Sequence, residues 1–243
     1  TDGDGISGTI NYIEKPSYLE PDQRYHQIQS NGKYIGRFGR KSAAIDLLHQ
    51  TVNAYKQDMG ITSEFDMADP VNFMISVLGD DNVADPEVSN STINKVVFYL
   101  QTLEAPRRRN PESSEVLVGE LVFEKVGCDK CHVSKLKTGP SEITALNEVE
   151  FYPYTDMLMH DMGSGLDDQY TEGGALTSEW RTMPLWGLGL QKDVQGGQTY
   201  LMHDGRAQTY KEAIGLHGGE AQNSREKYDQ LTEAEKTPIL IAV

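Results

Sequence analysis

Two cysteines, Cys128 and Cys131, stand three positions apart in this 243-residue chain, and a histidine, His132, follows the second directly. They are the only cysteines in the sequence. Thiols at this spacing suit three kinds of site: a thioredoxin-like redox pair, half of a zinc site, or the covalent attachment of a haem. Zinc needs about four ligands, and no second cysteine pair can supply the rest. Thioredoxin chemistry, in turn, does not need a histidine after the pair.

The segment C-D-K-C-H satisfies the requirements of haem attachment at every position. Each thiol adds to one haem vinyl group, and the adjacent imidazole reaches the iron from the proximal side. Upstream, apolar residues recur at helical spacing over 113–128, with Ser113 or Ser114 as N-cap. A helix that ends at C-x-x-C-H is typical of the first helix of a cytochrome c domain. We therefore expect haem c and a periplasmic location; a structural disulfide or a zinc ligand pair is the alternative.

The bulk composition restricts the partners. A formal net charge of −15 argues against a nucleic-acid groove or an anionic membrane surface. A basic redox protein as electron donor, or a small oxidant such as peroxide, fits better. No apolar run approaches the roughly 18 residues that a membrane span needs. With 37% hydrophobic residues, the chain can bury one large core or two small ones.

A second axial ligand cannot be chosen from composition, because eight methionines and five further histidines compete. The choice matters, since a thioether raises the reduction potential and an imidazole lowers it. Residues 200–221 predict a turn, a helix near 208–217 and a Gly-Gly stop. His217 lies at the end of that helix, beside glycines that let a planar ligand approach closely. Three competitors come from one other segment: Met159, His160 and Met162.

Five sequence blocks, in chain order, are FYLQTLEAPRRRNP, GELVFEKVGCDKCH, YPYTDMLMHDMGSGLDD, SEWRTMPLWGLG and HDGRAQTYKEAIGLHGGEA. Together they resemble the bacterial di-haem oxidoreductase family, also labelled thiol oxidoreductase or di-haem cytochrome c peroxidase-like. In related di-haem enzymes the sixth ligand, Met or Tyr, lies fourteen positions after the histidine of an H-D-G motif. Counted from His203, that position is His217. A histidine at this position departs from both kinds of relative, and it predicts a haem of lower potential held between His132 and His217.

Residues 36–61 resemble the distal wall of the first, peroxidatic haem of that family. Gln50 matches the family's glutamine, and Asp58 matches its catalytic acid. The relatives carry glutamate at that position, whose side chain is one methylene longer than that of aspartate. A carboxylate over an open haem iron can move a proton between the two peroxide oxygens. Without the resemblance, Asp58 is an ordinary solvated side chain that ends a surface helix over 41–57. Because the relatives carry two C-x-x-C-H motifs, we expect a second haem upstream of Thr1, in a longer protein.

The chain opens with Asp2 and Asp4 in a D-x-D-G pattern, spaced like part of a calcium loop. Related di-haem enzymes hold calcium near the interface between their haem domains. A calcium site is therefore one interpretation of this segment, and a plain Asp-Gly turn is the other.

Family position also implies a haem environment. Arg181 and His203, together with Arg206, are expected to bind haem propionates, since arginine pairs with carboxylates through a bidentate fork. These side chains could equally pin a loop. His160 is expected to pack against the haem edge.

Helical patterns recur with few alternating strand runs, over 41–57, 70–78, 91–104, 113–128, 208–217 and 224–236. We expect a mainly α fold, with a cytochrome c-type haem domain and long loops over 111–243. The distal part of a first haem domain is expected to precede it at 1–104. The leading function is electron transfer within a di-haem peroxidase-type oxidoreductase. Its alternatives are a non-catalytic mono-haem electron carrier and a secreted calcium-binding disulfide domain.

Overall fold

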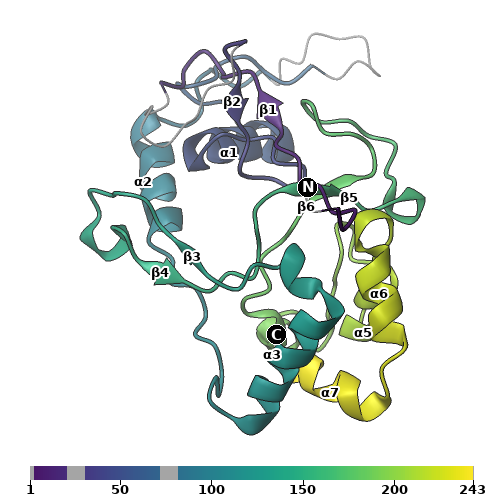
Figure 1. Ribbon diagram of the computed structural model, residues 1–243. Coiled ribbons are helices and arrows are strands. Elements are labelled where there is room, and N and C mark those ends of the chain that lie inside the picture. Colours follow the sequence, from purple (N-terminus) through teal and green to yellow (C-terminus); the bar gives the residue numbers. More distant parts are fainter. Residues whose placement is uncertain (1–2, 21–30, 72–81, 243) are drawn as a thin grey trace. The chain divides into compact units, whose positions relative to one another are not determined.

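The computed structural model describes residues 3–20, 31–71 and 82–242 (Figure 1). The chain forms two compact units. The N-terminal unit comprises Asn11–Glu104, and the C-terminal unit comprises Thr1–Ile10 together with Ala105–Val243. The first ten residues thus belong with the later part of the chain. That the two units correspond to two haem domains stays a prediction.

The N-terminal unit contains a short antiparallel pair of strands and two helical stretches. Strand β1 (Tyr12–Ile13) pairs with β2 (Tyr34–Ile35), with Tyr12 opposite Ile35. Helix α1 (Leu47–Asn53) continues without a break as a π-helix over Ala54–Asp58, and α2 (Asn90–Gln101) packs against α1. A small apolar core is formed by Ile13, Leu19 and Ile45.

Helix α1 begins later than the pattern over 41–57 predicts. The Asp46 carboxylate accepts the backbone N–H of His49 at 2.8 Å and caps the helix at that point. Four residues earlier, Ser42 has a φ of 53°, a left-handed conformation that an α-helix does not contain. Local capping and backbone conformation therefore shorten the helix.

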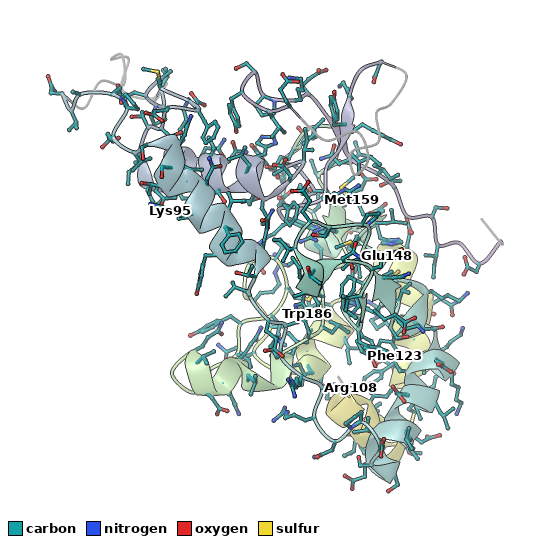
Figure 2. The ribbon with its side chains drawn as sticks, turned by 90° about the vertical axis from the view of Figure 1, so that its left-hand side faces the viewer. Lys95, Arg108, Phe123, Glu148, Met159 and Trp186 are labelled. Carbon is teal, nitrogen blue, oxygen red and sulfur yellow. The ribbon has the colours of Figure 1, made fainter. Side chains whose placement is uncertain are left out.

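The C-terminal unit is built around α3 (Ser114–Val126), which packs against α7 (Glu233–Ala242) and α6 (Gln222–Asp229) (Figure 1). Ser113, one of the two serines predicted as N-cap, caps α3, because its side chain accepts the N–H of Val116. The apolar core of the C-terminal unit contains Phe123, Tyr154, Tyr228 and Ile239. Figure 2 shows Phe123 on the ribbon of α3.

Loops and short elements make up the rest of the C-terminal unit. Strand β3 (Leu136–Lys137) pairs with β4 (Glu150–Phe151), and β5 (Met159–Asp161) pairs with β6 (Glu179–Arg181), both antiparallel. The remaining helices are α4 (Gln191–Val194) and α5 (Tyr210–Gly215). Short 3-10 turns occupy Cys128–Lys130, Thr144–Leu146, Ser164–Leu166, Leu188–Leu190 and Gly219–Ala221.

The prediction of a mainly α chain with long irregular loops is confirmed at this coarse level. The single helix predicted over 224–236 is two helices in the structure. Helix α6 ends at Asp229, and Thr232 caps α7 because its hydroxyl accepts the N–H of Glu235. The predicted helix over 70–78 lies mostly outside the described residues.

Among the residues that the structure describes, no helix is both long and apolar enough to cross a membrane.

Candidate functional site

The cysteine motif lies at the end of α3. Gly127 ends the helix in the left-handed conformation (φ 87°), and the chain turns at once into the 3-10 turn that carries Cys128. The backbone N–H of His132 donates to the carbonyl of Cys128 at 2.9 Å, which closes the motif into one compact turn. Cys128 and Cys131 are not joined by a disulfide, and both are partly buried. Burial, aided by the negative charge of Asp129, raises the pKa of the Cys128 thiol to about 12.

His132 is oriented by a backbone carbonyl. Its Nδ1 lies 2.9 Å from the carbonyl oxygen of Tyr154, and because a carbonyl only accepts, the imidazole carries its proton on Nδ1. Burial lowers the pKa of His132 to about 4, so the ring is neutral at physiological pH. A neutral ring of this tautomer keeps its Nε2 lone pair for a metal.

His217 has the same arrangement at the end of α5. Its Nδ1 lies 2.8 Å from the carbonyl oxygen of Ala213, which again leaves Nε2 as the free acceptor. Burial lowers the pKa of His217, so this ring is neutral as well. A charge on His217 would lower the pKa of His132 further, which places the two imidazoles in one neighbourhood. This geometry fits the predicted axial pair, whose role at iron stays a prediction.

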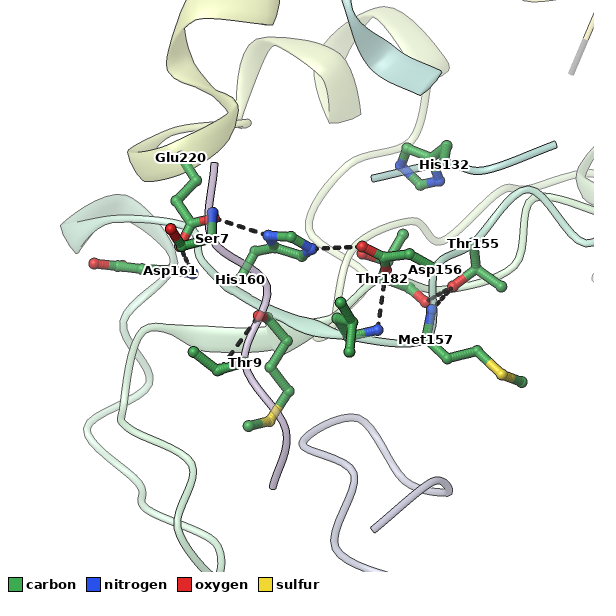
Figure 3. Close-up of polar contacts among 12 residues, drawn as sticks. Ser7, Thr9, His132, Thr155, Asp156, Met157, His160, Asp161, Thr182 and Glu220 are labelled. Atoms are coloured by element: carbon green, nitrogen blue, oxygen red, sulfur yellow. Dashed lines mark hydrogen bonds and ion pairs between the residues drawn. The ribbon is translucent and has the colours of Figure 1, made fainter. Parts of the chain in front are cut away.

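His160, the competing histidine, is occupied on both ring nitrogens (Figure 3). Nδ1 lies 2.8 Å from the Glu220 carboxylate and Nε2 lies 2.9 Å from that of Asp156. Burial by itself would lower the pKa of His160, but the hydrogen bonds to Asp156, Cys131 and Glu220 raise it to about 11. An imidazolium protonated on both nitrogens has no lone pair for iron. His160 is therefore a buried cross-link between two carboxylates.

The other two competitors differ in burial. Met159 is 2% exposed in the core beside β6, and Met162 is partly exposed. Nothing in their packing singles out either thioether.

The segment 154–156, here the clamp segment, runs alongside the motif and holds it in place. The N–H of Asp156 donates to the carbonyl of Cys131 at 2.9 Å, and the N–H of Thr155 donates to that of Val133 at 3.0 Å. Buried Thr155 also donates its hydroxyl to the carbonyl of Thr182 at 2.6 Å (Figure 3). Hydrogen bonds thus hold the clamp segment to the cysteine motif on one side and to Thr182 on the other.

Glu220 connects the opening residues to the same network. Its carboxylate accepts the backbone N–H of Ser7 at 2.7 Å while it holds His160 (Figure 3). Thr9 forms two backbone hydrogen bonds with Met159, at 2.8 and 3.0 Å. These contacts hold Ser7 and Thr9 to the C-terminal unit.

The three side chains predicted to bind haem propionates make different contacts in the structure. Arg206 donates to Asp204 at 2.7 Å and to the carbonyl of Gly165 at 2.8 Å, so it pins a turn. The His203 ring stacks on Trp180 with centroids 3.8 Å apart. Arg181 is partly buried, and it donates to the sulfur of Met183 at 3.4 Å.

The glycines beside His217 serve chain packing. A Cβ on Gly219, whose φ is 53°, would lie 2.1 Å from the carbonyl oxygen of Asp161. A Cβ on Gly218 would lie 2.8 Å from that of Met162. These glycines thus let two backbone segments approach closely, and the close approach of a planar ligand stays a prediction.

The predicted distal residues lie in the N-terminal unit. Gln50 is partly exposed on α1, and Asp58 is exposed at the last position of the π-helix. Segments of π-helix occur frequently at functional sites. His49 is not among the site residues that the sequence predicts; it is buried, and its Nδ1 accepts the N–H of Ile45 at 3.2 Å. The sequence signal that could have indicated it is a single histidine within an apolar helical segment.

The calcium prediction receives no structural support. Asp2 lies outside the described residues. The Asp4 carboxylate accepts the N–H of Ile6 at 2.9 Å and forms an ion pair with Lys130 of the motif. In the described part of the chain, no group of three or more acidic, histidine or cysteine side chains could hold a metal ion.

Comparison with known proteins places the whole chain in one family. A family model with the description "Di-haem oxidoreductase, putative peroxidase" matches residues 1–243. No curated protein and no solved structure matches the chain.

Proposed function

Because the chain belongs to the di-haem oxidoreductase family, we propose that its C-terminal unit binds a c-type haem and transfers electrons within a peroxidase-type oxidoreductase. The observation that carries this proposal is the pair of neutral imidazoles. His132 and His217 each donate Nδ1–H to a carbonyl and keep Nε2 free. Two thiols without a disulfide stand directly before one of them.

Each residue of the motif has a separate task. Cys128 and Cys131 would hold the haem through thioethers to its vinyl groups, and His132 and His217 would bind the iron through Nε2. When bound, the haem supplies a one-electron iron couple whose potential two imidazoles hold low. The Tyr154 and Ala213 carbonyls fix the tautomer of each ring. Arg181, which is partly buried, would pair with a propionate through its guanidinium.

The N-terminal unit carries the proposed proton chemistry. Asp58, exposed at the end of the π-helix, would be the acid–base group of the peroxide reaction, and Gln50 would be the second catalytic residue. This chemistry would belong to the second haem of the family. The oxidant is peroxide, the electron donor is a basic redox protein that suits the net charge of −15, and the location is the periplasm.

A second function is favoured by the same geometry. An iron bound by two imidazoles has no open position, so a protein with this haem alone would carry electrons without reducing peroxide. The chain contains one C-x-x-C-H motif, which suits such a carrier.

Intact mass of the protein from its native source, with covalent haem counted per chain, separates the two functions. Two haems support the peroxidase-type oxidoreductase, and one haem supports the electron carrier. A chain without any covalent haem would refute both. Peroxide-dependent oxidation of a reduced donor is the second measurement, and its absence in a two-haem protein would refute the peroxidase reaction.

A further inference from the structure

The backbone of Tyr154 is held in an unusual conformation where it meets His132. Its φ of 55° lies in the left-handed region, which a bulky aromatic residue rarely occupies. In this conformation the Tyr154 carbonyl accepts the Nδ1–H of His132 at 2.9 Å. Strained residues of this kind persist only where their surroundings hold them, and they cluster at functional sites.

Three side chains hold Tyr154 in that position. Its ring, 8% exposed, packs edge-on against Phe123 with centroids 6.1 Å apart. The Arg108 guanidinium lies 5.5 Å from the ring centroid, in cation–π range. The Tyr154 hydroxyl donates to the Glu120 carboxylate at 3.4 Å, and Arg108 pairs with the same carboxylate oxygen at 2.5 Å.

The cluster continues to the imidazole through a second route. The Phe123 ring lies 6.3 Å from the His132 ring, between centroids. Tyr154 is thus coupled to His132 by a backbone hydrogen bond and through the Phe123 ring. Arg108, labelled in Figure 2, comes from the loop before α3. Glu120 belongs to α3, so a displacement of either partner changes the support of the Tyr154 carbonyl.

A carbonyl that accepts Nδ1–H makes the imidazole a stronger electron donor at Nε2. A stronger donor stabilises the ferric iron and lowers the reduction potential, so second-shell hydrogen bonding is one means by which a protein sets this potential. Loosening the Tyr154 carbonyl should therefore raise the potential.

We propose that Tyr154 is a positioning residue for His132, held by the Arg108–Glu120 ion pair, and that this cluster sets the reduction potential of the C-terminal haem. The inference rests on the proposed function, since it needs a haem on His132. It adds a regulating element outside the attachment motif and outside the axial ligands.

The test is spectroelectrochemical titration of the haem-loaded chain with single substitutions. Arg108→Met and Glu120→Gln remove opposite charges. Simple electrostatics predicts that the first lowers the midpoint potential and the second raises it. The proposed positioning role of Tyr154 predicts that both substitutions raise the midpoint potential, because each one loosens the hydrogen bond from His132 to the Tyr154 carbonyl. Tyr154→Phe, which retains the ring and all charges, should raise it less.

A matched control removes a positive charge elsewhere in the C-terminal unit. Lys135 pairs with Glu150 at 3.3 Å, and both side chains are half exposed, so Lys135→Met should leave the potential unchanged or lower it slightly. Circular dichroism verifies that each variant is folded.

Shifts of opposite sign in the two charge variants, or no shift in any of the three cluster variants, would overturn the positioning role while the haem proposal stands. Failure of the unsubstituted chain to acquire covalent haem would overturn both.

Discussion

The buried His160 cross-link leads to a prediction on stability. The His160 side chain is 4% exposed, and its two carboxylate partners, Asp156 and Glu220, are 13% and 16% exposed. Removing one partner of a buried ion pair costs about 3–5 kcal/mol, because the remaining charge is left uncompensated. Both carboxylates keep a backbone donor, from Leu158 at 2.9 Å and from Ser7 at 2.7 Å. We therefore expect His160→Gln to lower the free energy of unfolding by about 3 kcal/mol.

The same cross-link should make stability depend on alkaline pH. Burial lowers the pKa of His160, but hydrogen bonds to Asp156, Cys131 and Glu220 raise it from 6.5 to about 11 in the folded chain. A raised pKa stabilises the folded state fully below pH 6.5, and this contribution is lost as the pH rises towards 11. The free energy of unfolding should therefore fall between pH 7 and pH 9, by at most about 1.4 kcal/mol per pH unit.

Urea unfolding followed by tryptophan fluorescence measures both effects, because Trp180 and Trp186, the two tryptophans, belong to the C-terminal unit. His49→Gln is the matched control. Burial lowers the pKa of His49, so it is neutral above pH 7 and its replacement should not alter the alkaline slope. The reasoning fails if His160→Gln costs under about 1 kcal/mol, or if its alkaline slope equals that of the unsubstituted chain.

Three further outcomes are expected. His217→Ala should convert a low-spin haem spectrum to high-spin; an unchanged optical spectrum would assign the sixth position to another side chain. Asp58→Asn should lower peroxide turnover by about 10²- to 10⁴-fold with haem content retained, and steady-state kinetics that show full activity would contradict its proton-transfer role. Gly127→Ala should cost about 1–2 kcal/mol in urea unfolding, since its φ is 87° and a Cβ would approach the Ser224 hydroxyl to 3.1 Å. The comparison variant Gly165→Ala, at ordinary φ and with nothing within 4 Å, should be neutral, and equal losses would refute the argument.

Local signals predicted the elements that depend on neighbouring residues. The helix that delivers the motif was predicted over 113–128 and is observed as Ser114–Val126, because capping by Ser113 and termination by Gly127 act within a few residues. The π-helix before Asp58 could not be predicted, because no composition rule separates it from an α-helix.

The histidines show the limit of reasoning from sequence. His160 and His217 are both histidines beside glycine-rich turns, and their spacing gives no information on protonation. In the structure one meets two carboxylates and the other meets a backbone carbonyl. Burial next to carboxylates keeps an imidazole charged, whereas burial next to a carbonyl leaves it neutral with a free nitrogen.

By itself the sequence determined that two thiols and an imidazole share one turn at the end of a helix, because covalent spacing and helix capping are local properties. Only the tertiary structure decided which histidines keep a free Nε2 and how Tyr154 is held against His132. Those properties depend on contacts between residues far apart in the chain, such as Arg108 with Tyr154, and on the burial that such contacts create.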